Sequence, residues 1–482
     1  MKKIKTLALA IILSTTAFSQ TQELPTSVAP TVADKIQERL KKEGLKVYLS
    51  NDSSQWLKAT VVMQAQARYD WNNPGSNVFG YAQNKTTDAG LRRLRLQLFG
   101  QVTKRVFVYT QFGLNNFNYL APRKQDAFFH DVVAEYSIWK KHLTFGTGLT
   151  SFGGPLRYSA PAVGSILMAD APIYQQTTSD QNDQFGRKLG IYFKGQLGKF
   201  DYRIAVGKPF SMQTQVPTIG STAATSIDTS YSSNAKFSPA PPDLQYQGYF
   251  KYHFFDKESN DLPYNTGTYL GKKHMLTLGA GIQYQQNAMR YWNGSSVPVS
   301  PTATEIASNL KSSNLLIIGL DLFYDSFLNK EKGNAISVYA AYSYADYGQN
   351  YLRYNGVMNM TTAMNTSVAN LNAKAFGNAF PMMGTGSSEF AQIGYKFKNN
   401  LLGERGTLQP YIGTQISQYK ALQSNNMVMC DVGVNWLISG YNKISLNYQN
   451  RPVYEQDAVT KNYVDVESAR RGMLYLQYQI AF

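Results

Sequence analysis

Apolar and polar residues alternate along most of the chain from residue 57 onward. The end of the chain shows the pattern most clearly, because every second residue from Leu474 to Phe482 is apolar, with Gln477 and Gln479 between them. A period of two predicts extended strands with one apolar face. We place sixteen strands, with approximate spans 57–71, 91–103, 105–116, 127–139, 141–150, 186–197, 199–208, 244–256, 274–288, 314–325, 335–347, 388–398, 407–418, 427–438, 442–451 and 471–482.

The connections between these strands alternate between long and short. Such a rhythm is typical of a membrane-spanning antiparallel barrel, which has long external loops and short periplasmic turns. Most strands have about the 9 to 11 residues that a tilted strand needs to cross a bilayer. Two connections break the rhythm: 257–273 is long for a turn, and 419–426 is short for an external loop. We therefore expect that one strand boundary in these regions is misplaced.

Composition supports an all-β membrane protein and excludes a helical one. The 482 residues are only 43% hydrophobic but include 34 Tyr and 25 Phe, and Tyr is favoured where a barrel meets the membrane surface. The chain also ends on an aromatic residue, Phe482, and this resembles the last strand of bacterial outer-membrane barrels. The single cysteine, Cys430, excludes an internal disulfide, and its position in the alternation predicts a lipid-facing side chain.

The first 56 residues lack the alternation. Residues 1–19 combine lysines, a short apolar run and a small-residue end, which is typical of a cleaved secretory signal peptide. Residues 20–56 form a polar periplasmic segment with a short helix at 35–43, preceded by a capping Thr or Asp and followed by Gly44. The barrel then occupies residues 57–482.

The mature chain is strongly basic. The leader contains three lysines and no acid, so its removal lowers the net charge from +16 to +13. The charge is not clustered in a run and no nucleic-acid reading motif is present, so we expect no nucleic-acid partner. Basic residues dominate the inward positions of the strands: Lys58, Arg68, Arg93, Arg95, Lys188, Lys194, Arg203, Lys251, Lys396, Lys443 and Arg451, against Asp131, Glu135, Asp201, Asp321 and Asp431.

Two interpretations of these inward charges remain open. Acids and bases can pair across strands and stiffen the wall, or the excess base can line an anion pathway. The densest group includes Arg93 and Arg95, which project to the same side about 7 Å apart along the strand and offer planar donors to an oxyanion. Arg92 has lipid parity, and we expect it to reach toward the headgroups.

The third external loop, near 151–185, begins after a glycine-rich stretch that would let the chain turn into the barrel. A phosphate-binding nucleotide loop is excluded because neither the third glycine nor a following helix is present. The loop carries one basic residue, Arg157, against Asp170, Asp180 and Asp183.

Several stretches together resemble the phosphate-selective porin family, in the form common in Bacteroidetes: Arg92-Arg93-Leu94-Arg95-Leu96, Phe145-Gly146-Thr147-Gly148, Asp170-Ala171-Pro172, Gln184-Phe185-Gly186-Arg187-Lys188-Leu189-Gly190 and Gly198-Lys199-Phe200-Asp201-Tyr202-Arg203. The resemblance covers about residues 57–210. It implies a sixteen-stranded, usually trimeric barrel in outer-membrane lipid, with the third loop folded inside and basic residues along the channel. By this resemblance Arg93 and Arg95 belong to the row of basic residues that binds passing anions along the channel. The acidic third loop departs from the pattern and leaves phosphate specificity open.

We therefore expect a porin with an anion pathway formed by Arg93, Arg95, Arg68, Lys58, Arg157, Lys188, Lys194, Arg203 and Lys251. Enzymatic interpretations are weak because none of the four histidines has metal-ligand spacing, and a hydrolase based on His142 lacks a recognisable serine partner. We expect no catalytic residues, metal or cofactor. The alternative is a structural outer-membrane barrel within a secretion or gliding complex, which would need no open lumen.

Overall fold

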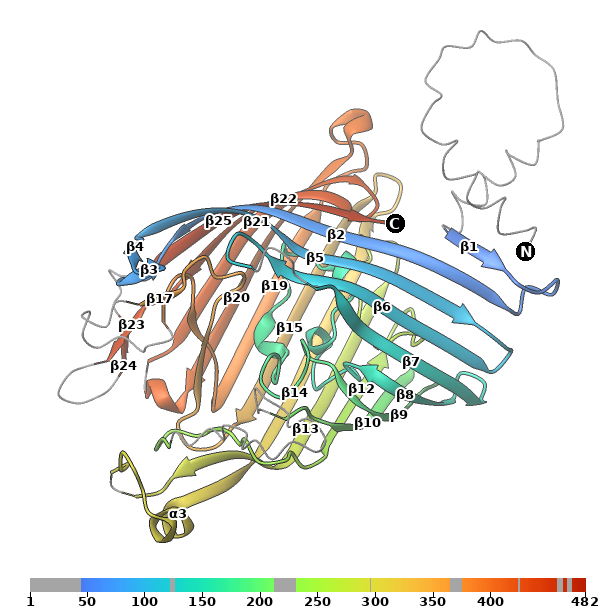
Figure 1. Cartoon of the computed structure of the whole chain (residues 1–482). Coiled ribbons are helices and arrows are strands. Elements are labelled where there is room, and N and C mark those ends of the chain that lie inside the picture. Colours follow the sequence, from blue (N-terminus) through green and yellow to red (C-terminus); the bar gives the residue numbers. More distant parts are fainter. Residues whose placement is uncertain are drawn as a thin grey trace, which may run out of the picture. The chain divides into compact units, whose positions relative to one another are not determined.

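The computed structural model describes residues 45–121, 126–211, 231–294, 296–364, 375–423, 425–456, 463–465 and 470–482, and within them an antiparallel sheet closes into a barrel (Figure 1). The sixteen predicted strands are confirmed. Their bounds are β2 Trp56–Trp71, β5 Lys85–Gln101, β6 Val106–Phe117, β7 Phe128–Trp139, β8 Leu143–Thr150, β9 Lys188–Leu197, β10 Phe200–Lys208, β12 Gln245–His253, β13 Met275–Trp292, β14 Leu310–Asn329, β15 Asn334–Asp346, β19 Gly386–Lys396, β20 Thr407–Tyr419, β21 Met427–Ser439, β22 Asn442–Arg451 and β25 Arg471–Ala481.

The last strand closes the barrel by pairing with the first. β25 pairs with β2 from Val62↔Ala481 to Asp70↔Met473, while the other edge of β2 pairs with β5. On the inner face Gln64 donates to Gln479 at 2.8 Å, and Gln66 donates to Gln477 at 2.7 Å. A closed wall leaves no unpaired backbone groups facing lipid along its strands.

The alternation separates two faces of the wall. Outward residues include exposed apolar side chains on strands all round the barrel, among them Leu96, Ile191, Leu278, Ile393 and Leu476. A continuous apolar exterior of this kind fits hydrocarbon rather than water. The inward residues are largely polar and buried, and Cys430 lies on the outward parity of β21. No helix among the described residues is long and apolar enough to cross a membrane.

Shorter elements occupy the ends of the barrel and the loops. β1 (Leu45–Tyr48) pairs with Trp56 to Ala59 of β2, an addition that the sequence did not predict. The others are β3 Ser76–Val78, β4 Tyr81–Ala82, η2 Arg157–Ser159, η3 Val163–Ser165, η4 Ile173–Gln175, β11 Lys236–Phe237, α3 Ala303–Asn309, β16 Leu352–Asn355, β17 Ala363–Met364, β18 Phe380–Gly384, η5 Gly403–Arg405, η6 Lys420–Leu422, β23 Tyr454–Gln456 and β24 Tyr463–Asp465. The predicted leader at 1–19 and helix at 35–43 lie outside the described residues.

Two ends of the barrel can be distinguished. The turn end holds the start of β2 and the end of β25, and its connections are 102–105, 140–142, 198–199, 254–274, 330–333, 397–406 and 440–441. The loop end holds the longer connections, including 151–187 between β8 and β9, which we call loop 3. The connection 254–274 between β12 and β13 is called turn 4.

Loop 3 lies inside the ring of strands and packs on the far wall. Leu156, Leu167 and Met168 are buried in a cluster with Phe323, Tyr339, Phe390 and Tyr411, which come from β14, β15, β19 and β20. Backbone carbonyls of the loop accept hydrogen bonds from Asn435, Lys443 and Gln479 of the wall. Part of the lumen is therefore a packed apolar core.

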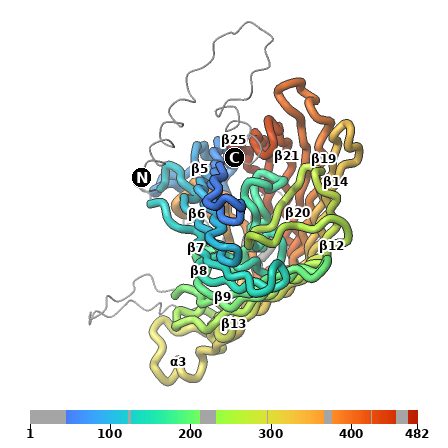
Figure 2. The backbone as a smooth tube through the Cα atoms, turned by 90° about the vertical axis from the view of Figure 1, so that its right-hand side faces the viewer, coloured from blue at the N-terminus to red at the C-terminus, as the bar shows by residue number. Residues whose placement is uncertain are grey.

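Turn 4 also folds into the barrel (Figure 2). Its residues Glu258, Asn265, Thr268 and Leu270 are each at most 4% exposed. The expectation of a misplaced strand boundary is wrong at this connection, because β12 and β13 end close to where the alternation places them. The connection is long because it fills the lumen.

Candidate functional site

Three arginines of β5 point into the barrel side by side. The pairing of β5 with β2 shifts register between Gln64↔Arg93 and Ala65↔Leu91, so Arg92 is the extra residue of a β-bulge. A bulge re-aims a side chain that strict alternation would place outside. Arg92, Arg93 and Arg95 are all buried, at 6%, 5% and 2% exposure. The expectation that Arg92 reaches the lipid headgroups is therefore wrong.

Asp170 of loop 3 binds two of these arginines. Its carboxylate accepts from Nε of Arg92 and from Nη2 of Arg93, both at 2.7 Å. Burial alone would raise the pKa of Asp170, but the charges of Arg92 and Arg93 outweigh burial and hold that pKa below its usual range. Gln64 accepts a further bond from Arg93 at 2.9 Å. The loop is thus tied to the wall at the arginine cluster.

Arg95 and Arg187 complete the cluster. Nη1 of Arg95 donates to the carbonyls of Leu94 and Leu114, both at 2.8 Å, and its Nη2 donates to Asn115. Arg187, the residue before β9, donates to Tyr264 of turn 4 at 3.0 Å and lies 3.7 Å from Asp131. Among the described residues, Nε of Arg95 has no hydrogen-bond acceptor. The cluster therefore keeps a buried donor available.

The four arginines line a small pocket, which we call the arginine pocket. Its volume is about 40 Å³, and its other lining residues are Asn115, Ser151, Ser159, Ala160, Pro161, Val163, Gln176, Phe185 and Tyr264. Such a space holds a few water molecules or one small oxyanion. The hydroxyl of Ser151 is buried without a hydrogen-bond partner in the described part of the chain. Two carboxylates, Asp170 and Asp131, offset four guanidiniums, so the pocket keeps an excess of positive charge.

A second, larger cavity opens at the turn end and is called the vestibule. Its volume is about 720 Å³. Seven basic residues line it against two acids, Glu135 and Asp261. The basic residues are Lys58, Lys104, Arg105, Lys140, Lys141, Lys194 and Lys273. An excess of one sign within low-dielectric walls raises the local concentration of counter-ions.

Most other residues of the predicted pathway hold internal segments in place. Arg68 donates to the carbonyls of Val357 and Met358, and Lys188 pairs with Asp183 at 3.2 Å. Lys194, Arg203 and Lys251 contact turn 4, and Arg157 is buried in a pair with Glu258. Only Arg93 and Arg95 of the predicted set line the arginine pocket, while Lys58 and Lys194 line the vestibule.

Sequence reasoning missed three of the residues that matter here. Arg92 is hidden by the bulge, which alternation does not reveal. Tyr264 lies in the connection 257–273, which was singled out only for its unusual length as a turn. Arg187 was noted only as part of a family-like motif, because the predicted strand 186–197 includes it, whereas β9 begins one residue later, at Lys188.

Sequence comparisons give no relative for this chain. No model of a known protein family matches it, and no curated protein matches it.

Solved structures do resemble it. OprB of Pseudomonas putida, in its high-pH structure, aligns with 93% of this chain and 97% of its own at 9% identity and a TM-score of 0.50. OmpF of Salmonella typhi in complex with daunomycin covers 90% of this chain and 100% of its own at 8% identity and a TM-score of 0.47. A BenF-like porin from Pseudomonas fluorescens covers 88% and 99% at 12% identity and a TM-score of 0.37. On the OprB alignment, the chain has the fold of an outer-membrane porin.

Proposed function

We propose that the protein is an outer-membrane diffusion channel for small hydrophilic solutes and that it prefers anions. The arginine pocket is the observation that carries this proposal, because it gathers four guanidiniums around a space the size of a small oxyanion, while two carboxylates, Asp170 and Asp131, form ion pairs with them. Guanidinium groups offer paired donors that match the geometry of phosphate and similar oxyanions. Inorganic phosphate is therefore the anion to test first.

The vestibule supports the same direction of selectivity. With the turn end in the periplasm, an anion leaving the arginine pocket would enter a space lined by seven basic residues. Two fields of the same sign along one route would lower the barrier for anions and raise it for cations.

The deciding experiment is the reversal potential of the full-length protein in a dilute KCl gradient. The double substitution Arg93→Gln and Arg95→Gln should shift it toward cation selectivity, and Arg92→Gln should shift it in the same direction because Arg92 points inward. Leu96→Val, on the lipid face of the same strand, is the control. The shift should shrink at about 1 M salt, where the Debye length is about 3 Å. Cation preference in the unmodified protein would overturn the proposal.

We also propose a homotrimer, in line with the family that the sequence resembles. An apolar groove of about 900 Å³ lies on the lipid face near the seam, by which we mean the pairing of β2 with β25. The groove supports a contact between copies, because small residues of β2 and β5 leave room for a neighbour's side chains. These residues include Ala65, Ala67, Ala89 and Gly90. The partners of the channel would be outer-membrane lipid, two further copies and small anionic solutes.

A structural barrel within a larger complex is the second candidate. The apolar cluster that loop 3 forms with four strands inside the lumen favours it, since a plugged barrel needs no conduction. Planar-bilayer recordings separate the two, because a purely structural barrel gives no unitary current in KCl.

A further inference from the structure

Turn 4 differs from the other connections at its end of the barrel. Turn 4, at residues 254–274, is longer than every other connection at the turn end, of which 397–406 is the longest. Its buried residues lie in the lumen and not in the solvent outside the turn end of the barrel. A segment that enters from the turn end therefore meets loop 3, which enters from the loop end.

A backbone contact joins the two segments. Pro161 and Asn265 form a parallel β-bridge, in which the amide of Ala162 donates to the Asn265 carbonyl and the amide of Asn265 donates to the Ala160 carbonyl, each at 2.8 Å. The side chain of Asn265 also donates to the Arg157 carbonyl at 3.1 Å. The two segments thus share hydrogen bonds that neither could satisfy alone in the lumen.

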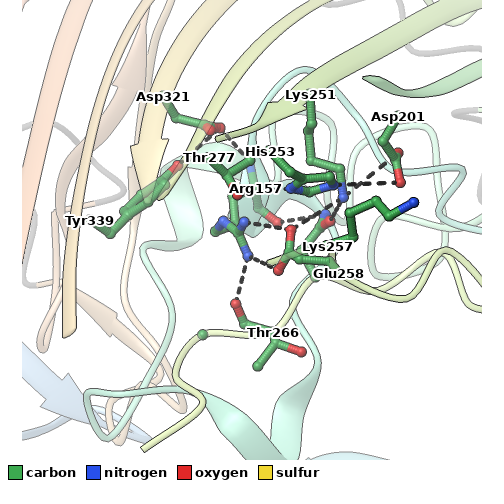
Figure 3. A network of polar contacts seen from close by, with 12 residues as sticks. Arg157, Asp201, Lys251, His253, Lys257, Glu258, Thr266, Thr277, Asp321 and Tyr339 are labelled. Carbon is green, nitrogen blue, oxygen red and sulfur yellow. Dashed lines mark hydrogen bonds and ion pairs between the residues drawn. The ribbon is translucent and has the colours of Figure 1, made fainter. Parts of the chain in front are cut away.

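A buried ion pair reinforces the contact (Figure 3). Arg157 of loop 3 donates to both carboxylate oxygens of Glu258, at 2.9 and 2.7 Å, and to the carbonyl of Thr266 at 2.7 Å. The side chains of Arg157 and Glu258 are 0% and 3% exposed. Lys251 of β12 reaches Glu258 at 3.4 Å and Asp201 of β10 at 3.7 Å, which ties the pair to the wall.

Tyr264, near the middle of turn 4, borders both cavities. It lines the arginine pocket and the vestibule, and the neighbouring chain of loop 3 also divides them, with Pro161 on the pocket side and Ala162 on the vestibule side. Its hydroxyl donates to Asp131 and accepts from Arg187 at 3.0 Å. The phenol therefore occupies a donor of Arg187, a residue that lines the arginine pocket.

We propose that turn 4 is a gate between the arginine pocket and the vestibule, with Tyr264 as the residue that closes the route. The inference rests on the proposed channel function and adds to it a specificity-determining segment. A solute passes when turn 4 and loop 3 part at the Pro161 and Asn265 bridge. The movement exposes Arg187, which then takes a solute oxygen in place of the Tyr264 hydroxyl.

The first test is the single-channel conductance of the full-length protein in planar bilayers, with potassium chloride and then potassium phosphate. Tyr264→Ala should raise the conductance about twofold or more, because the narrowest point limits flux. Leu262→Ala is the matched control, since Leu262 belongs to the same turn and lines only the vestibule. Equal conductance of the unmodified protein and Tyr264→Ala would overturn the gate.

The second test locks the two segments together. Pro161→Cys and Asn265→Cys place thiols on bridge partners within disulfide range, in a Cys430→Ser background that removes the native thiol. The oxidised protein should show a several-fold lower open probability, and dithiothreitol should restore it. An oxidised protein that conducts like its reduced form would overturn the proposal.

The two tests separate the gate from the proposed anion preference. If Tyr264→Ala raises the current while the unmodified protein prefers cations, the gate stands and the anion preference fails. If the unmodified protein prefers anions and neither variant changes the current, the anion channel stands and the gate fails. If no variant passes current, both fail and the structural barrel remains.

Discussion

Glu258 makes its contacts deep inside the barrel, where its carboxylate pairs with Arg157 and Lys251. Glu258→Gln leaves Arg157 charged and unpaired in the interior, so we expect a loss of roughly 3–5 kcal/mol in the free energy of unfolding. Urea unfolding in detergent measures it. Lys104→Met is the control, because the Lys104 and Asp52 pair, at 3.5 Å, is largely solvent-exposed and should leave the midpoint unchanged. Equal midpoints for both variants would contradict the role of the pair.

The same pair predicts how stability responds to pH. Burial alone would raise the pKa of Glu258, but Arg157 and Lys251 outweigh burial and hold it well below the ordinary 4.5. A depressed folded pKa contributes stability that is complete above the unfolded pKa and is lost as pH falls through the folded value. We therefore expect no loss from this pair between pH 8 and about pH 5.5. A difference between the unmodified protein and Glu258→Gln that disappears by pH 6 would contradict this.

At single residues, sequence reasoning succeeded where alternation is regular and failed where it is broken. Arg93 and Arg95 lie two apart on a strand and were placed correctly on the inner face. Arg92 was placed outside, because a bulge depends on the partner strand and leaves no mark in one sequence. The ion pairs of Lys188 with Asp183 and of Lys251 with Glu258 were also out of reach, since Asp183 and Glu258 lie in connections whose course depends on tertiary packing.

Among the elements, loop 3 lies so close to the wall that inward glycines face it. A Cβ added at Gly281 of β13 would overlap the carbonyl of Pro155, and one at Gly394 of β19 would come within 2.6 Å of Leu167. Gly281→Val should therefore destabilise the protein by about 1–3 kcal/mol through overpacking. Ala280→Val, on the lipid face of the same strand, should not. The urea concentrations at the unfolding midpoints of the two variants measure this difference. Equal midpoints would mean that loop 3 moves away from the added side chain without loss of stability.

The strands were predictable because a lipid face and a polar face impose one pattern on every strand. The strand boundaries were less predictable. β13 ends at Trp292 instead of the predicted 288, and β14 begins at Leu310 instead of the predicted 314. The hairpin of these two strands continues past the region where the alternation is clear. The course of turn 4 was not predictable, since a polar segment of that length is equally compatible with a position outside the barrel.

At the scale of the whole molecule, the groove near the seam leads to a prediction about assembly. Ala67 is exposed on the lipid side and lines the groove. If the protein is the proposed trimer, Ala67→Trp should fill the groove and shift trimer to monomer, measured by chemical cross-linking in native membranes. Ala340→Trp, on the outer face of β15 and away from the groove, is the control. Cross-linked species that are identical for both variants and the unmodified protein would place the subunit contact elsewhere.

The seam between β2 and β25 has a consequence for how the protein folds. Gln64 and Gln479, which meet across it, are 415 positions apart in the chain. Pairings this remote raise the contact order and slow folding, and the wall cannot close before its final residues have been made. Until then the free edge of β2 is open to wrong partners. β1 lies on the same side of β2, pairs through a short hairpin and covers the start of that edge early. Local pairing can therefore form at the hairpin of β1 and β2, while closure of the barrel needs β25.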